Sequence, residues 1–350
     1  MSEPLLSVRD LVVRFSTEHG AVYAVNGVSF DVEAGGAVGL VGESGSGKSV
    51  TNLAIMQLLP RGGRIVSGEV WFDGRDLTKL SQNEMRRLRG KELAMVLQDP
   101  QSSLNPVITI GEQIEEAVRA HETVSRQAAR ARAIELLASV GIPRPGEQLD
   151  RYPHQFSGGM RQRVMISIAL ALHPKVLIAD EPTTALDVTV QAQVLELLRE
   201  LTGELGTAIV LISHDLGIMA RMTQRISVMY AGSIVESAST AGLFAEPQHP
   251  YTVGLLRSIP RIGGEGSLRP IEGAPPDMDR APIGCSFAPR CAWRVDACWA
   301  ITPPLVADVD PSHRLACHDP VATDEVKAGR PLRDGFVPAS PPTLVRDGTA

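Results

Sequence analysis

The chain has 350 residues, of which 43% are hydrophobic, and its formal net charge is −6. This length fits one large domain, alone or with a smaller appendage, and the negative charge excludes the overall basic field that drives nucleic-acid binding. The dense basic cluster at 86–91 is interpreted as a solvated helix face. No apolar run reaches the roughly 18 to 20 residues that a membrane span needs, and MSEPLLSVRD at 1–10 shows no signal-peptide pattern. We therefore expect a cytosolic chain that has no nucleic-acid partner and reaches a membrane only through other proteins.

The first part of the sequence shows strand patterns. Apolar and polar residues alternate in LLSVRDLVVRF at 5–15, VNGVSFDVEAG at 25–35 and GEVWFDGRDL at 68–77. These segments predict an antiparallel sheet. Between them, AVGLVG at 37–42 is wholly apolar or glycine and predicts a short buried strand.

The segment GESGSGKS at 42–49 follows that buried strand and leads into SVTNLAIMQLL, which has helical spacing. Strand, glycine-rich loop and helix is the order of a P-loop, whose backbone N–H groups wrap nucleotide phosphates. Here Lys48 would neutralise the outer phosphates and Ser49 would bind Mg2+. The alternative, an ordinary glycine-rich turn, is disfavoured by this order of elements. The predicted nucleotide-binding residues of this region are Gly42, Glu43, Ser44, Gly45, Ser46, Gly47, Lys48, Ser49 and Val50.

Polar residues stand at the ends of three further apolar runs. Gln98 follows LAMVL, Asp180 ends VLIAD and is followed by Glu181, and His214 follows AIVLIS. Asp180 is predicted to hold Mg2+ through water, and Glu181 to activate the hydrolytic water. Gln98 is predicted to touch Mg2+ or that water, and His214 to contact the terminal phosphate and hold the carboxylate in register. The alternatives are solvated acids that cap a buried strand and a structural histidine.

A helical region separates these runs. Residues 110–140 are predicted to be helical with Ile134, Leu137 and Val140 on one face, and PRPGEQLDRYP at 143–153 closes the segment.

Two further helix starts follow. FSGGMRQR at 156–163 places two glycines before a helix, which predicts a second anion site or, more simply, an N-cap at Ser157. Asp187 is predicted to cap an amphipathic helix at 188–201. The apolar positions of that helix are Val190, Val194, Leu197, Leu198 and Leu201.

The P-loop lysine, Gln98, FSGGMRQR, Asp180 with Glu181, and His214 follow one another along the chain. In this order they resemble the ATP-binding subunit of ABC transporters. FSGGMRQR resembles the signature of the family, PTTALD at 182–187 its D-loop, and Gln98 and His214 its Q-loop and switch histidine. Met160 departs from many relatives, which carry glutamine there. The resemblance implies an α/β P-loop NTPase fold with a RecA-like core, an antiparallel β subdomain and a helical subdomain at about 99–172. The signature disfavours a simple kinase.

The resemblance also implies how such a subunit works. The signature, here Ser157, Gly158 and Gly159, closes over ATP that the P-loop of a second ATPase subunit holds, and that subunit is either identical or homologous. An aromatic ring ahead of the P-loop stacks on adenine; we assign this to Tyr23, with Phe15 or a purely structural ring as the alternatives. Residues 100–106 would meet a coupling helix of a membrane subunit.

The C-terminal part of the sequence, from residue 245, indicates a narrower class of ABC transporter. AEPQHPYTVGLLRSIP at 245–260 and the later IEGAPPD, GCSFAPRC and ACH resemble the C-terminal extension of dipeptide and oligopeptide importer ATPases. This implies ATP-driven peptide uptake with two transmembrane permease subunits and an extracytoplasmic solute-binding protein, from the cytoplasmic side of the inner membrane. The alternatives are import of nickel or another small solute, or a soluble ABC ATPase. The absence of a coiled-coil insertion and of a second P-loop disfavours the last of these.

We expect an ATP-binding domain at 1–243, an extension at 244–320 and a disordered tail at 321–350. His249-Pro250-Tyr251 should form a rigid turn before a short helix.

The cysteines all fall in the extension, at the spacing C-x5-C-x6-C-x18-C; they are Cys285, Cys291, Cys298 and Cys317. Disulfides are disfavoured in a reducing cytosol, so a shared metal is the natural alternative. Zinc usually takes a short CxxC knuckle, which is missing, whereas a [4Fe-4S] cluster tolerates wider spacing. The sequence therefore favours an iron–sulfur cluster over zinc or no metal. His313 and His318 could add ligands, although a solvated loop is simpler.

Overall fold

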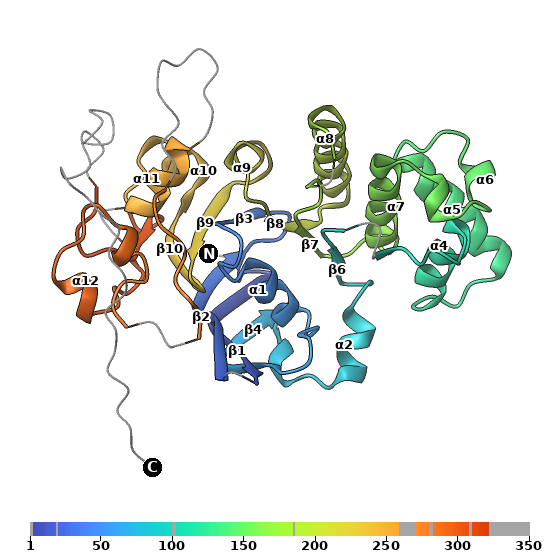
Figure 1. Cartoon of the computed structure of the whole chain (residues 1–350). Helices are drawn as coiled ribbons and strands as arrows, with labels where there is room; N and C mark the ends of the chain where they lie inside the picture. The colour runs from blue at the N-terminus through green and yellow to red at the C-terminus, as the bar shows by residue number, and fades with distance from the viewer. Residues whose placement is uncertain are drawn as a thin grey trace.

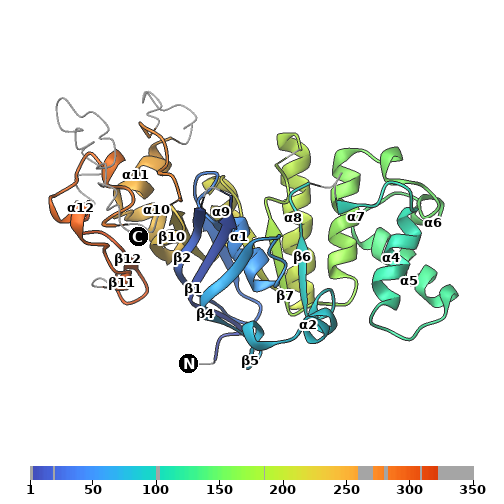
Figure 2. The same ribbon diagram turned by 60° about the horizontal axis from the view of Figure 1, so that its bottom comes forward.

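The structure is a computed structural model, and it describes residues 3–18, 20–99, 103–184, 186–258, 271–279, 283–307 and 310–321. The described parts lie in a row, with a group of helices at one end, the sheets in the middle and the C-terminal extension at the other end (Figure 1). The turned view keeps the same order (Figure 2). The predicted disordered tail falls outside the described residues, apart from Val321.

The predicted antiparallel sheet is confirmed. Its strands, in the order in which they pair, are β2 (Gly20–Val32), β1 (Leu6–Thr17), β4 (Gly63–Phe72) and β5 (Arg75–Asp76). In β1 the buried positions change from Leu6 and Val8 to Leu11 and Val13. The pairing with β2 shifts register between Val8 and Leu11, and Asp10 between them has φ +47°. A β-bulge at Asp10 thus keeps the apolar side chains on one face along the whole strand.

The second sheet forms the centre of the molecule. Its strands, in pairing order, are β11 (Val306–Ala307), β12 (Arg314–Leu315), β10 (Ser233–Ser239), β9 (Arg225–Tyr230), β3 (Ala37–Val41), β8 (Ala208–Ile212), β7 (Val176–Asp180) and β6 (Leu93–Val96). The strands from β9 to β6 are parallel, while β10, β12 and β11 continue the sheet antiparallel. Every residue of β3, β7 and β8 is buried, as expected for parallel strands covered on both faces.

Helices flank the sheets and fill the two ends. Beside the sheets lie α1 (Lys48–Ile55), α2 (Gln82–Leu88), α8 (Val188–Leu205), α9 (Leu216–Met222) and α10 (Thr240–Ala245). The helical end contains α4 (Ile110–Arg119), α5 (Arg126–Ser139), α6 (Pro145–Gln148) and α7 (Gly158–Leu170). The cap predicted for α8 is confirmed, because the Asp187 carboxylate accepts a hydrogen bond of 3.0 Å from the backbone N–H of Val190.

The prediction for residues 110–140 was partly wrong. The segment forms two helices, α4 and α5, each with its own N-cap at Thr109 and Ser125. The buried face of α5 runs through Ala129, Ala133 and Leu137, at spacing i, i+4, i+8, and Ile134 lies off that face with 37% of its surface exposed. Leu137 and Val140 are buried as predicted, and the prediction failed at Ile134 because two of the packed positions of α5 are small alanines, which a count of large apolar residues overlooks.

The extension is attached to the central sheet. Its strand β12 pairs with β10 through Glu236 and Ser237, and it also contains α11 (Pro250–Arg257) and α12 (Ala297–Ala300). The expected turn before α11 is confirmed, because Nδ1 of His249 accepts a hydrogen bond of 3.1 Å from the N–H of Tyr251. The extension therefore adds strands to the edge of the central sheet.

Candidate active site

The predicted P-loop connects the end of β3 to the start of α1. Gly47, the N-cap of α1, has φ +100°, and a Cβ there would lie 2.4 Å from the carbonyl oxygen of Ala24. Only glycine fits both the backbone angle and the close approach. The loop thus brings the N-terminus of α1, with its unpaired N–H groups and positive dipole end, to the edge of the sheet, where an anion can bind.

Lys48 lies folded against the loop that precedes it. Its ammonium group donates to the carbonyl oxygens of Gly42 at 2.8 Å and Glu43 at 2.9 Å, and to Oγ of Ser46 at 3.3 Å. Burial lowers the pKa of Lys48, and the nearby carboxylates of Glu181, Asp180 and Glu43 oppose that shift. The cation is therefore held at the centre of the phosphate-binding turn.

Two of the three residues predicted to bind Mg2+, Ser49 and Asp180, lie side by side. Oγ of Ser49 donates to Oδ1 of Asp180 at 3.1 Å, although 131 positions separate them in the sequence. Asp180 is 5% exposed, and burial raises the pKa of its carboxyl group. Mg2+ usually takes one or two protein oxygens and completes its shell with water and phosphate. A hydroxyl and a carboxylate at this spacing fit that requirement.

Glu181 is the meeting point of the other predicted catalytic residues. Its Oε2 accepts a hydrogen bond of 3.0 Å from Nε2 of Gln98 and lies 3.4 Å from Nδ1 of His214. Thr184 adds a second hydrogen-bond donor, because its hydroxyl lies 2.9 Å from the same oxygen. The structure thus brings Gln98 and His214 to Glu181, and it places the Gln98 amide on this carboxylate. Thr184 was missed, although it stands in the PTTALD segment three residues after Glu181.

The backbone holds Glu181 in a specific position. Its φ is +45°, in the left-handed region, and its N–H donates to the carbonyl oxygen of Ile212 in β8 at 3.0 Å. The chain therefore turns sharply after β7 while it remains tied to the neighbouring strand. This turn directs the side chain of Glu181 toward the residues that follow β6 and β8.

The glycine segment at 156–163 starts α7 at the helical end of the molecule. Oγ of Ser157 accepts a hydrogen bond of 3.3 Å from the N–H of Met160, so Ser157 is the N-cap. A Cβ on Gly159 would lie 2.5 Å from Cγ1 of Val190 in α8. Ser157 and Gly158 are exposed. Both views place α7 among the helices at the end, whereas α1 lies with the sheets (Figures 1 and 2).

Tyr23 and Phe15 differ in their surroundings. Tyr23 precedes Ala24, whose carbonyl approaches Gly47, so it lies beside the P-loop. The Arg14 guanidinium covers one face of the Tyr23 ring at 4.5 Å from its centroid. Phe15 instead packs over Gly63 of β4. The position of Tyr23 is the one that suits a ring beside bound nucleotide.

Comparison with known proteins agrees with this geometry. Residues 25–184 match the family described as ABC transporter, and residues 235–298 match the oligopeptide/dipeptide transporter C-terminal region. The dipeptide transport ATP-binding protein DppD of Bacillus subtilis is 49% identical over 317 residues, which cover 90% of this chain and 94% of that protein. The chain belongs to the ABC transporter ATPase family. The oligopeptide transport ATP-binding protein OppD of Escherichia coli is 46% identical over 321 residues, with 91% and 94% coverage.

Solved structures show the same cassette. The dimeric ATP-binding cassette MJ0796 bound to ADP and Pi has a TM-score of 0.61 at 28% identity, covering 67% of this ABC ATPase and 98% of that chain. The structure of cbiO1 of Clostridium perfringens, part of the ABC transporter complex cbiONQ, has a TM-score of 0.58 at 25% identity, covering 70% of this chain and 92% of that chain. The predicted α/β ATPase cassette fold is therefore confirmed.

The four cysteines of this ATPase are free thiols. Burial, together with the smaller effect of neighbouring cysteines, raises the pKa of Cys291 and of Cys317 to about 12. The N–H of Cys285 donates to the carbonyl oxygen of Cys298 at 2.7 Å. Among the described residues, however, no group of three or more His, Cys, Asp or Glu side chains is arranged to hold a metal ion. The thiols gather in one region, but their arrangement does not support the predicted cluster.

The two histidines considered as extra ligands have other partners. Nε2 of His313 lies 2.8 Å from Oε1 of the buried Glu236, and Nε2 of His318 lies 2.8 Å from the carbonyl oxygen of Ile301.

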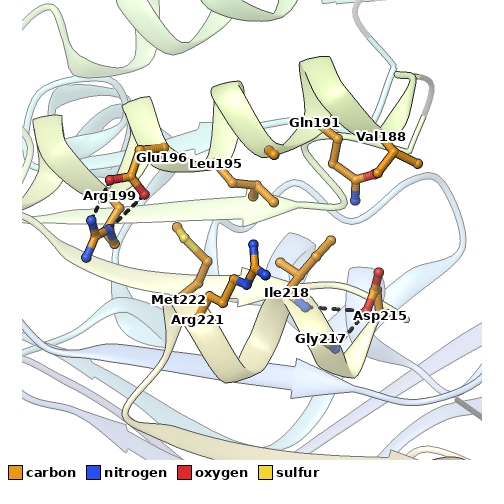
Figure 3. A pocket seen from close by; sticks show the side chains of 11 residues that line it. Val188, Gln191, Leu195, Glu196, Arg199, Asp215, Gly217, Ile218, Arg221 and Met222 are labelled. Carbon is orange, nitrogen blue, oxygen red and sulfur yellow. Dashed lines mark hydrogen bonds and ion pairs between the residues drawn. The ribbon is translucent and has the colours of Figure 1, made fainter. Parts of the chain in front are cut away.

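A cavity of about 580 Å³ lies between α8 and α9 (Figure 3). Within it Glu196 pairs with Arg199, and Asp215 accepts hydrogen bonds from the backbone at the start of α9. Its lining residues come from α8, α9 and Asp215, the residue after His214, and neither Lys48 nor Glu181 is among them. Across the described residues, no helix has the length and hydrophobicity that crossing a membrane requires.

Proposed function

We propose that this ABC ATPase couples hydrolysis of ATP to the import of dipeptides or oligopeptides across the cytoplasmic membrane. Two features of the chain together support this proposal. One is the P-loop site, and the other is the match of residues 235–298 to the oligopeptide/dipeptide transporter C-terminal region. Relatives named for dipeptide and oligopeptide transport align over nine-tenths of the chain. Import of nickel or another small solute is the alternative substrate class.

In the proposed mechanism the P-loop backbone and Lys48 bind the β- and γ-phosphates of ATP, and the ring of Tyr23 stacks on adenine. Val50 and the other P-loop residues form the first turn of α1 and the loop before it. Ser49 and Asp180 hold Mg2+, which offsets the phosphate charge when it is bound. The short distance between their side chains supports this assignment.

Glu181 is proposed to accept the proton of the attacking water. Its Oε2 accepts hydrogen bonds from Gln98 and Thr184 and lies 3.4 Å from Nδ1 of His214, so none of these contacts uses Oε1. That second oxygen is the one that can face the water, while the contacts to Oε2 fix the orientation of the carboxylate. Gln98 and His214 then act beside Glu181 and the terminal phosphate.

The proposed partners follow from the position of the glycine segment. Ser157, Gly158 and Gly159 stand at the start of α7, which lies at the helical end, whereas α1, the helix after the P-loop, lies with the sheets (Figure 2). We propose that they close over ATP on a second ATPase subunit, as the dimeric state of MJ0796 suggests. Leu97 is 43% and Val107 is 78% exposed, and these apolar side chains flank the segment proposed to meet the permeases. Residues 100–102 of that segment lie outside the described residues.

The full assembly would contain two ATPases, two permease subunits and an extracytoplasmic solute-binding protein, with this chain peripheral on the cytoplasmic side. We retain the division into an ATPase at 1–243 and an extension at 244–320 as part of the proposal. The test is to purify the complex that forms around a tagged chain, identify its subunits by mass spectrometry and reconstitute it in proteoliposomes. ATP-dependent uptake of labelled peptides, lost in Lys48→Ala, is expected. Uptake of Ni2+ but not of peptides would show that the substrate is nickel instead of peptides. A chain that purifies without permeases would contradict the transport function.

An iron–sulfur cluster on the four cysteines remains a hypothesis of this proposal. It is supported only by the grouping of four free thiols in the extension. Iron and acid-labile sulfide should be measured on anaerobically purified protein beside a variant with all four cysteines changed to serine. Equal, near-zero iron in both proteins would contradict the hypothesis. Stoichiometric zinc in the unchanged protein would show that the four cysteines form a zinc site instead.

A further inference from the structure

The P-loop of this chain contains a negative charge. Glu43 is the second residue of GESGSGKS, and its carboxylate is near enough to Lys48 to act on the pKa of that ammonium group. A carboxylate beside bound phosphates repels them unless a cation offsets its charge. The sequence alone offers no cation for this purpose near residue 43, apart from Lys48, which the phosphates need.

Arg290 of the extension supplies that cation. Its Nη1 lies 2.7 Å from Oε2 of Glu43, and its Nη2 lies 3.0 Å from Oε1, so the pair is bidentate. The side chain of Arg290 is only 4% exposed, and that of Glu43 is 27% exposed. Bidentate pairs of this kind are among the stronger and more directional ionic contacts, and burial protects this one from screening by salt.

The remaining donors of Arg290 are fixed by its own surroundings. Its Nε donates to the carbonyl oxygen of Glu272 at 3.0 Å, Nη2 also donates to that of Ile271 at 3.2 Å, and Nη1 donates to Oη of Tyr230 at 3.4 Å. Burial would lower the pKa of Arg290, but the hydrogen bonds and charge of Glu43 outweigh it and raise the pKa. The guanidinium is therefore charged and already oriented toward the P-loop.

Two further contacts tie the extension to the nucleotide site. The backbone N–H of Glu43 donates to Oη of the fully buried Tyr251 at 2.8 Å. The N–H of Tyr23 donates to the carbonyl oxygen of Met278 at 2.7 Å. The extension thus holds both the start of the P-loop and the strand that carries the proposed adenine platform.

We propose that Arg290 is a positioning residue for ATP, which neutralises Glu43 and keeps its carboxylate turned away from the phosphates. The extension is then one wall of the nucleotide site and sets its affinity. This inference rests on ATP binding at the P-loop, as proposed above.

The test measures ATP and ADP affinity of the full-length chain with fluorescent nucleotide analogues in Arg290→Met, Arg290→Lys and the double variant Glu43→Gln/Arg290→Met. The matched control is Arg294→Met. Arg294 belongs to the same extension, lies three residues after Cys291 and contacts the carbonyl oxygen of that cysteine and the ring of Trp299. Circular dichroism and thermal unfolding of each variant report whether the fold is kept.

Arg290→Met is expected to weaken ATP binding about tenfold, because it leaves an unpaired negative charge beside the phosphates. The affinity for ADP should fall less than the affinity for ATP, since ADP carries one phosphate fewer. Arg290→Lys should retain most of the affinity, and the double variant should recover to within about threefold of the wild-type value. Arg294→Met should bind ATP as the wild type does.

A double variant that binds as weakly as Arg290→Met would overturn the proposal, because damage to the extension alone cannot be repaired by removing the charge of Glu43. Wild-type affinity in Arg290→Met would also overturn it, provided that Lys48→Ala weakens binding in the same assay. If Lys48→Ala has no effect, the nucleotide-binding function itself is wrong, so the two failures are distinguishable.

Discussion

Substitution of Glu181 by glutamine tests the centre of the proposed mechanism. The amide has the shape of the carboxylate, and its oxygen can still accept the hydrogen bond from Nε2 of Gln98, which is 3.0 Å long in the structure. The hydroxyl of Thr184 can rotate to suit either atom of the amide. The fold around residue 181 should therefore survive, and the change that remains is the loss of a group that accepts a proton.

The size of the effect follows from that single loss. General base catalysis contributes about 10²- to 10⁴-fold to a rate, which corresponds to roughly 3 to 5 kcal/mol of activation free energy. We expect the turnover number of the assembled complex to fall by this factor. The affinity for ATP should change by less than about threefold, because the P-loop and Lys48 supply most of the phosphate contacts.

The assay is steady-state phosphate release by the reconstituted complex at saturating ATP, with nucleotide affinity measured separately. Glu204→Gln is the control, because Glu204 is an exposed acid near the end of α8. It should leave turnover as it is in the wild type. Unchanged hydrolysis in Glu181→Gln would refute the role of this residue as the base, and a large loss of ATP affinity would show that Glu181 serves binding instead.

Three other outcomes are expected. Lys48→Ala should weaken ATP binding about 10- to 100-fold, because a charge-assisted hydrogen bond contributes roughly 1.5 to 3 kcal/mol; unaltered affinity in a calorimetric titration counts against the P-loop assignment. Gly159→Ala places a methyl group 2.5 Å from Cγ1 of Val190, so the complex should lose ATPase activity while the isolated subunit still binds ATP. The second change Val190→Ala should restore part of that activity, and failure of this rescue argues against steric conflict. Burial lowers the pKa of His249 from 6.5 to about 4. The contribution of neutral His249 to the free energy of unfolding is therefore fully present above pH 6.5, and about 3 kcal/mol of it is lost as the pH falls from 6.5 to 4. Thermal unfolding of His249→Phe should show a weaker pH dependence over that range, and equal slopes would contradict the assignment.

The parts of the site that could be predicted from the sequence are those fixed by local pattern. Each of Gln98, Asp180 and His214 directly follows or ends an apolar run, and parallel strands deliver their carboxyl ends to one edge of a sheet. The convergence of Gln98 and His214 on Glu181 follows from this rule. The cap at Asp187 could be predicted for the same reason, because capping depends on residues within one turn.

The parts that could not be predicted depend on packing between distant segments. Ile134 has the same local pattern as Leu137, and only the arrangement of α5 against its neighbours decides which of them is buried. The pair Arg290 and Glu43 is separated by 247 positions, and neither residue type is unusual where it stands. Thr184 lies in a segment whose family role was recognised, but its contact with Glu181 requires the left-handed turn at residue 181. A sequence pattern contains no information on such contacts until the fold has placed the segments.

The extension and the cassette share a buried polar centre, and this bears on how the chain divides. Glu236 in β10 is fully buried. Its carboxylate accepts hydrogen bonds from the N–H groups of Gln248 at 2.8 Å and His249 at 3.0 Å, and it lies 2.8 Å from Nε2 of His313. All three partners come after residue 243, and a buried carboxylate without partners is strongly unfavourable. The sequence boundary at 243 therefore marks a change of pattern within one folding unit, which agrees with a C-terminal family match that begins at residue 235, inside β10.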